Sequence, residues 1–211
     1  MSAAPSLPTV HVVDDDPSFL TAVSRLLRAG GYQVQTYASS ADFLKRPSAG
    51  TPGCVVLDLR MPGPDGMALQ AALDEADSPL PVVFLTGHGD IPTSVRAMRQ
   101  GAVDFLTKPV KKEALFDAVR RALASDASAR EQRARRRALR EAYEALTPRE
   151  REVLTHVVAG QLNKQTAGDL GTCERTIKAH RAAIMQKLGV ASVADLVRFA
   201  QELGIRPAGA K

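Results

Sequence analysis

Cysteines, long apolar runs and a basic leader are scarce or missing in this 211-residue sequence. Only Cys54 and Cys173 are present, far apart and without the spacing of metal ligands. A disulfide framework is therefore excluded, and both are interpreted as small buried residues in a reducing compartment. No apolar run approaches the roughly 20 residues of a membrane-spanning helix, so no membrane partner is expected. The opening segment MSAAPSLPT does not resemble a secretory signal, so we expect a cytoplasmic protein.

The basic charge is concentrated toward the C-terminus. Two units are expected from the length, because domains commonly contain roughly 100 to 200 residues. Residues 1–124 carry 12 basic and 13 acidic side chains, whereas residues 125–145 carry 6 and 4. Residues 146–211 carry 10 and 6, which is most of the overall net charge of +5. Such a balance indicates a polyanionic partner for the second unit.

Residues 125–145 have the composition of a helical linker. They contain neither Gly nor Pro and are rich in Ala, Arg and Glu. A helix of this length would form a semi-rigid spacer of about 30 Å. Its RARRR segment is interpreted as a solvated helix face rather than a nucleic-acid contact, because Glu131, Glu141 and Glu144 are interleaved with the arginines.

The first unit alternates short β-rich apolar runs with amphipathic helical stretches. Asp16 and Pro17 have the pattern of an N-cap and first helical residue. The alternation predicts an α/β fold, a doubly wound five-stranded parallel sheet that binds ligands at the carboxyl ends of its strands. The expected strands are Thr9–Val13, Tyr32–Thr36, Cys54–Leu57, Pro81–Leu85 and Val103–Leu106.

Chemistry-bearing side chains follow four of these strands. Asp14 and Asp15 follow the first and Asp58 the third, and Thr86 and Lys108 follow the fourth and fifth. Because a parallel sheet brings these ends to one edge, the carboxylates are expected to gather around a hard divalent cation, Mg²⁺ or Mn²⁺. A carboxylate nucleophile, a bound cation, a hydroxyl and an ammonium group fit phosphoryl transfer, with an acyl phosphate as the product.

Four segments resemble the receiver domain of bacterial two-component response regulators. They are VVDDD at 12–16, VVLDLRMPGPDG at 55–66, VVFLTGHGD at 82–90 and GAVDFLTKP at 101–109, and the resemblance covers about residues 8–124. It implies a flavodoxin-like fold in which Asp58 accepts a phosphoryl group from a sensor histidine kinase. Metal binding would then fall to Asp14, Asp15, Asp58 and the backbone carbonyl of Arg60.

The resemblance also assigns a conformational switch. It implies that Thr86 and Phe105 are switch residues, that Lys108 contacts the phosphoryl group, and that the Lys108–Pro109 bond is cis. Arg60 and His88 are candidates for setting the phosphoryl lifetime. Taken singly, each acidic or basic residue could be a turn, capping or surface residue. Their joint placement at the strand ends favours a phosphoacceptor site.

From Leu146 onward the pattern is that of short helices. Thr147 to Glu150 form a capping box, which begins a helix that ends near Gly160. Further helices are predicted over Asn163–Leu170, Glu174–Leu188 and Ser192–Leu203. A Gly-containing turn before a basic helix is typical of a DNA-reading helix-turn-helix in an all-α four-helix domain. A solvated bundle or a protein-binding module is the alternative interpretation.

The segments LTPREREVLTHVVAG, NKQTAGDL and RTIKAHRAAIMQKLGV resemble LuxR-type DNA-binding domains, and the whole chain resembles the NarL/FixJ class. This class implies that the last helix forms a dimer contact on DNA. Thr166, Gly168, Thr172 and Cys173 depart from the family pattern, and Cys173 replaces a capping Ser, although Thr172 could take over as cap. The expected DNA-contact residues are Lys164, Arg175, Thr176, Lys178, Ala179, Arg181, Ala182 and Lys187.

Together these features predict a phosphorylation-controlled transcription factor and not an enzyme, apart from assistance to its own Mg²⁺-dependent phosphorylation and dephosphorylation. The expected partners are a sensor histidine kinase, double-stranded promoter DNA and a second copy when phosphorylated, with RNA polymerase as a further candidate. A phosphate-independent docking module and a phosphatase of small acyl phosphates are the alternatives. The expected domains are a receiver at 1–124, a helical linker at 125–145 and a DNA-binding domain at 146–211.

Overall fold

The computed structural model describes residues 7–45, 51–75, 80–87 and 91–209 and divides the chain into two compact units, 1–129 and 130–211. One helix, α5 (Lys112–Glu144), contains residues of both units. No helix in the described part of the chain is long and apolar enough to cross a membrane. Each unit has its own hydrophobic core.

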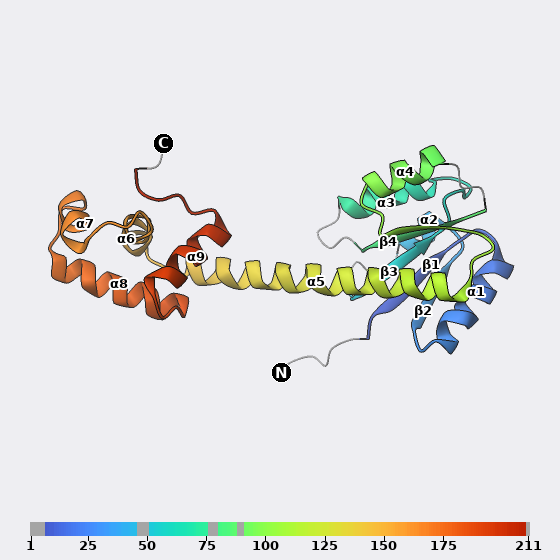
Figure 1. Cartoon of the computed structure of the whole chain (residues 1–211), viewed down its shortest axis with the longest axis horizontal. Helices are drawn as coiled ribbons and strands as arrows, with labels where there is room; N and C mark the ends of the chain where they lie inside the picture. Colours follow the sequence, from blue (N-terminus) through green and yellow to red (C-terminus); the bar gives the residue numbers. More distant parts are fainter. Residues whose placement is uncertain (1–6, 46–50, 76–79, 88–90, 210–211) are drawn as a thin grey trace. The chain divides into compact units, whose positions relative to one another are not determined.

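The first unit contains the predicted parallel sheet, with strand order β2-β1-β3-β4-β5 (Figure 1). The register pairs Val13 with Leu57, the last residues of the first and third strands. Asp14 and Asp58 directly follow these two residues and therefore lie side by side at the same edge of the sheet. Each predicted strand lies within one residue of an observed strand, which confirms the doubly wound α/β fold. The strands are β1 (Thr9–Val13), β2 (Gln33–Tyr37), β3 (Gly53–Leu57), β4 (Val82–Thr86) and β5 (Asp104–Thr107).

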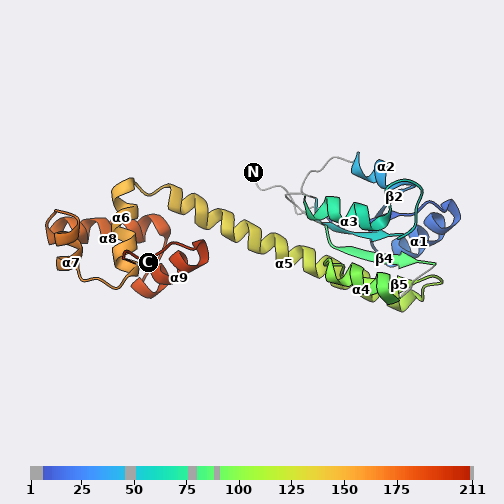
Figure 2. The same cartoon turned by 90° about the horizontal axis from the view of Figure 1, so that it is seen from above.

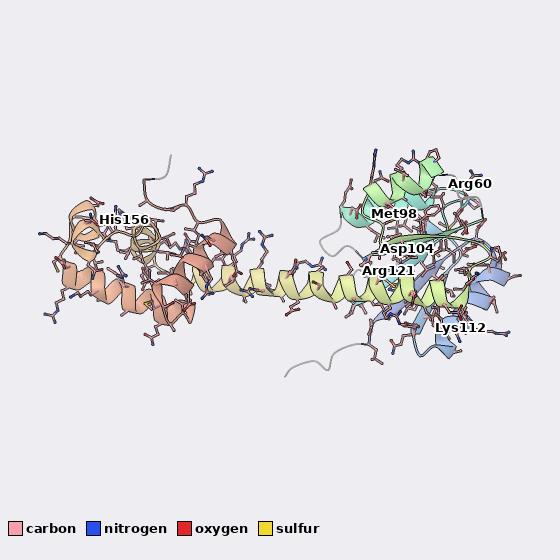
Figure 3. All side chains as sticks on the ribbon, in the orientation of Figure 1. Arg60, Met98, Asp104, Lys112, Arg121 and His156 are labelled. Atoms are coloured by element: carbon pink, nitrogen blue, oxygen red, sulfur yellow. The ribbon has the colours of Figure 1, made fainter. Side chains whose placement is uncertain are left out.

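Helices cover both faces of the sheet (Figure 2). On one face, α1 (Pro17–Ala29) and the first part of α5 enclose a core that includes Val10, Leu27 and Leu115. On the other face, α2 (Ser40–Leu44), α3 (Gly66–Asp74) and α4 (Ile91–Arg99) enclose a second core with Phe43 and Phe84. Asp104 of β5 and Arg121 of α5 form an ion pair at the sheet edge (Figure 3).

Asp126 anchors α5 to the sheet, although the sequence places it in the linker. Its side chain is buried, and Oδ2 accepts the backbone N–H of Gly53 at 2.9 Å. Ala122 and Val119, which precede it on the same helix face, are buried as well. The helical prediction for residues 125–145 is confirmed to Glu144, and Asp126 at the start of that segment is buried against the sheet.

The two cysteines lie in opposite environments, and the interpretation of both as buried is wrong for Cys173. Burial raises the pKa of the Cys54 thiol to about 12, with a smaller contribution from the negative charge of Asp126. Cys173 is exposed, and a hydrogen bond with the Thr176 hydroxyl lowers its pKa. The thiolate is the reactive form of cysteine, so the two side chains should differ sharply in reactivity.

We expect the folded chain to react rapidly with one equivalent of a disulfide reagent, at Cys173. Cys54 should react only after denaturation, because its thiol is both buried and protonated. Thiol titration of the native protein, of urea-denatured protein and of Cys173→Ser measures this difference. Rapid modification of native Cys173→Ser would contradict the buried placement of Cys54.

The second unit contains α6 (Pro148–Val158), α7 (Asn163–Asp169), α8 (Glu174–Leu188) and α9 (Val193–Leu203). Thr147 and Glu150 form the predicted capping box, and Gly189 ends α8 in the left-handed conformation. The helices enclose a core of apolar side chains, with Leu154, Ile177 and Ile184 fully buried. The all-α prediction for this unit is confirmed.

Two of the unusual residues have clear structural positions. Thr166 is fully buried, with its hydroxyl 3.5 Å from the Gln161 side-chain oxygen. Cys173 is the N-cap of α8 and makes no side-chain capping bond. The alternative in which Thr172 takes over as the cap is not borne out, because Cys173 occupies the N-cap position. Arg135 of α5 also belongs to this unit, and its Nε and Nη2 contact the Glu202 carboxylate of α9 at 3.0 and 2.7 Å.

Candidate functional site

Three aspartates meet at the carboxyl edge of the sheet. Ligand oxygens of Asp14, Asp15 and Asp58 lie within 4.8 Å of one another. The backbone N–H of Asp58 donates to the Val13 carbonyl at 2.9 Å, which brings the end of β3 to the end of β1. Asp14 and Asp58 are buried and Asp15 is exposed. An open position next to two buried carboxylates suits a cation that retains some of its water ligands.

Lys108 provides the positive charge at this edge. Its Nζ lies 2.5 Å from Asp14 Oδ2 and 3.4 Å from Asp58 Oδ1. Its backbone N–H donates to the Thr86 carbonyl at 2.8 Å, and the Lys108–Pro109 bond is cis, as the resemblance implies. The cluster combines three carboxylates with one ammonium group, which contacts two of them, so it retains an excess of negative charge. The donor set therefore fits a divalent cation.

Burial raises the pKa of the Asp58 carboxyl group, and the negative charge of Asp14 adds to this effect. The ammonium group of Lys108 opposes it. Asp58 thus bears a poorly solvated carboxylate, which is a stronger nucleophile than one surrounded by water. The arrangement can present one carboxylate oxygen to an electrophile while neighbouring positive charge compensates the oxygens of that electrophile.

The structure describes three of the remaining residues predicted near this edge. Thr86 is buried at the end of β4, and the half-buried Phe105 ring lies 6.2 Å from the Phe84 ring. Arg60 is exposed (Figure 3). It lines a pocket together with Arg96. His88 lies outside the described residues. The structure thus brings together Asp14, Asp15, Asp58 and Lys108.

In the second unit, α8 presents a basic and solvent-exposed surface. Lys178, Ala179 and Ala182 are exposed on this helix, as are Arg175 near its start and Lys164 on α7. Arg181 is partly buried, and its Nη1 donates to Asn163 Oδ1 at 3.0 Å. The surface offers positive charge around two small side chains, an arrangement that can approach a nucleic-acid groove closely.

Comparison with known proteins identifies both units. Residues 10–120 match the family model described as the response regulator receiver domain, and residues 144–200 match that of bacterial regulatory proteins of the luxR family. The chain is a response regulator. Its first unit is a receiver domain and its second is a LuxR-type DNA-binding domain, the combination found in transcriptional regulators.

Relatives of this response regulator match along nearly its whole length. The response regulator protein TodT of Pseudomonas putida is 43% identical over 92% of this chain and 86% of its own. The transcriptional regulatory protein FixJ of Azorhizobium caulinodans is 41% identical over 96% of both chains. The solved structure of the response regulator StyR superposes with a TM-score of 0.84 and 44% identity, covering 93% of this chain and all of that one.

The receiver domain depends on a glycine that the sequence reasoning did not single out. A methyl group at Gly66 would lie 2.5 Å from the Asp58 carbonyl oxygen and 3.1 Å from the Leu59 Cα atom. Gly66 therefore allows the start of α3 to approach the backbone of Asp58. The available signal was its position directly after Asp65, which caps α3 by accepting the Ala68 N–H.

Besides Arg181, two more of the predicted DNA-contact residues make contacts within the LuxR-type domain. Lys187 Nζ lies 2.7 Å from Oε2 of the buried Glu150, and this bond holds the pKa of the Glu150 carboxyl group below its usual range. The Thr176 hydroxyl contacts the Cys173 sulfur at 3.3 Å. Sequence reasoning missed the Lys187–Glu150 pair, because Glu150 lies 37 residues before Lys187 and already serves the capping box.

Proposed function

We propose that this response regulator receives a phosphoryl group on Asp58 from a sensor histidine kinase and that this event controls dimerisation and sequence-specific binding to promoter DNA. The observation that carries the proposal is the meeting of Asp58 with Asp14, Asp15 and Lys108 at one edge of the sheet. We place its action in the cytoplasm, with RNA polymerase as a further partner.

In the proposed reaction, an Asp58 carboxylate oxygen forms a bond to phosphorus while the bond between phosphorus and its donor breaks. Mg²⁺ held by Asp14, Asp15, Asp58 and the Arg60 carbonyl would compensate charge on the transferred group. Lys108 contacts one phosphoryl oxygen through its ammonium group. The chain thus assists its own phosphorylation and dephosphorylation without acting as an enzyme on other substrates.

The acyl phosphate then biases a switch. Asp58 changes from a carboxylate to a bulkier and more negative group, and the hydroxyl of Thr86 at the neighbouring strand end can hydrogen-bond to it. Thr86 and Phe105 would shift together, because they lie on the adjacent and paired strands β4 and β5. The changed surface favours a dimer, and the linker at 125–145 connects the receiver at 1–124 to the DNA-binding domain at 146–211.

Phosphorylation with acetyl phosphate tests this function directly. In the presence of Mg²⁺, wild-type protein is expected to gain the mass of one phosphoryl group, to dimerise and to bind DNA selected from a random pool more tightly. Asp58→Asn should do none of these, whereas Asp117→Asn, at an exposed position on α5, should behave as wild type. Absence of an adduct would refute the proposal, and continuous phosphate release would indicate a phosphatase instead.

Lys178 and Lys187 are expected to differ in effect although both are basic residues of α8. Lys178→Ala removes an exposed charge and should weaken DNA binding about tenfold without changing stability. Lys187→Ala leaves the buried Glu150 carboxylate without this partner and should lower the free energy of unfolding by about 1–3 kcal/mol. Fluorescence anisotropy with labelled DNA and urea denaturation measure the two effects, and equal losses of DNA affinity at unchanged stability would contradict the assignment.

A further inference from the structure

The ammonium group of Lys108 rests on the aromatic face of Phe19. Lys108 Nζ lies 4.0 Å from the centroid of the Phe19 ring, while it also contacts Asp14 at 2.5 Å and Asp58 at 3.4 Å. Of the Lys108 side chain, 20% is exposed. Attraction between a cation and an aromatic face grows as water is removed from the cation, so this partly buried position favours the contact.

The beginning of α1 determines where Phe19 lies. Asp16 Oδ1 accepts the backbone N–H groups of Ser18 and Phe19, and Asp16 donates its own N–H to Asp14 Oδ1 at 3.0 Å. The other carboxylate oxygen of Asp14, Oδ2, accepts a hydrogen bond from the Lys108 ammonium group. Asp14, Asp16, Phe19 and Lys108 therefore form a closed ring of contacts. The position of the aromatic ring is tied to that of an acidic residue in the cluster.

An aromatic face suits this position because it attracts the ammonium group without competing for its other partners. The ring has no lone pair that could bind a metal ion and no N–H that could bind a phosphoryl oxygen. It also shields one side of the ammonium group from water. A lysine side chain is long and flexible, so a third contact limits the volume that its ammonium group explores.

We propose that Phe19 is a positioning residue for Lys108, which holds the ammonium group over the acidic cluster where an incoming phosphoryl group would meet it. This inference rests on the proposed phosphorylation of Asp58. Phe19 takes no part in the bond changes, since phosphorus is transferred to the Asp58 oxygen as its bond to the donor breaks. Its effect is on how often Lys108 is correctly placed.

A purely structural role for Phe19 makes a different prediction. Phe19 also lines an apolar groove with Val23, Leu26, Pro109 and Val110. If packing were its only role, any apolar side chain of similar volume would serve. Leucine and methionine preserve apolar contact but lack the π face, whereas tyrosine preserves the π face. The comparison among these three variants separates the two roles.

The test uses the full chain with Mg²⁺ and acetyl phosphate, followed by intact mass. Phe19→Leu and Phe19→Met are expected to be phosphorylated about three to ten times more slowly than wild type, and Phe19→Tyr within about twofold. Leu26→Ala, in the same groove, serves as the control for lost packing and should keep the wild-type rate. Carbon-proton NMR of the lysine ε-CH₂ groups supplies a second readout, with Lys108 assigned by its absence in Lys108→Arg.

The ε-CH₂ signals of Lys108 should be shifted upfield by the ring in wild type and in Phe19→Tyr, and not in Phe19→Leu or Phe19→Met. Wild-type phosphorylation rates in the leucine and methionine variants would overturn the inference, and so would an equally slow tyrosine variant. If wild-type protein forms no adduct at all, the proposed function fails, and the NMR shift then decides the Phe19 contact alone. Its absence from wild type would overturn that contact.

Discussion

Lys108→Met is expected to slow phosphorylation of Asp58 by about a hundredfold or more and, at the same time, to tighten Mg²⁺ binding about tenfold. The ammonium group that would stabilise the transferred phosphoryl group is lost in this variant. The same group lies 2.5 Å from Asp14 and 3.4 Å from Asp58, so without a phosphoryl group it competes with a divalent cation for the carboxylates. One substitution should therefore change two measured quantities in opposite directions.

Lys112→Met is the matched control for this experiment. Lys112 begins α5 only four residues later, and its ammonium group lies 5.5 Å from the Phe116 ring, so the variant removes an equal charge outside the cluster. Phosphorylation is followed by intact mass, and Mg²⁺ binding by calorimetry in the absence of a phosphodonor. A normal rate in Lys108→Met would remove Lys108 from the proposed reaction, and weaker Mg²⁺ binding would show that it does not compete for the cation site.

Asp126→Ala is expected to lower the free energy of unfolding of the receiver domain by about 2–4 kcal/mol. The Asp126 side chain is 2% exposed and accepts the Gly53 N–H across 73 residues of sequence. Alanine would leave that N–H buried without this acceptor and would leave a space between α5 and β3. Because a bond between distant segments is lost, the amides at the start of β3 should also exchange faster with solvent.

Two further variants make the Asp126 result specific. Asp126→Asn retains a side-chain oxygen that can accept the Gly53 N–H, so it should lose less stability than Asp126→Ala. Glu131→Ala, at an exposed position on the same helix, should stay within about 0.5 kcal/mol of wild type. Urea denaturation and hydrogen exchange of the full chain measure these effects. Equal stability of Asp126→Ala and Glu131→Ala would mean that α5 needs no such anchor.

The fold and the acidic cluster could be predicted because both depend on local sequence patterns. Apolar runs followed by Asp14 or Asp58 report strand ends, and parallel strands bring those ends together. The contacts that refine the site could not be predicted in this way. Phe19 with Lys108 and Lys187 with Glu150 are pairs of ordinary residues whose meeting depends on helix rotation and packing.

In the linker, too, the sequence predicted the secondary structure but not which side chains are buried. Its helical composition was correctly interpreted, yet composition does not indicate which residues face a sheet. The residues that flank Asp126 in the sequence are those of an ordinary solvent-exposed helix. Its burial results only from the packing of α5 on β3. The exposed Cys173 was misjudged for a related reason, since residue type predicts average burial and not the exposure of one N-cap.

The ion pairs of the LuxR-type domain affect how its binding to DNA should depend on salt. Counterion release counts only those phosphates that are neutralised by cationic side chains of the protein. Lys187, Arg149 and Arg198 already face carboxylates of the same domain. Binding should therefore release fewer counterions from DNA than the 10 basic residues of residues 146–211 would suggest. A plot of log affinity against log salt concentration will report the side chains left over, and its slope becomes a count of the charges that this domain keeps for DNA.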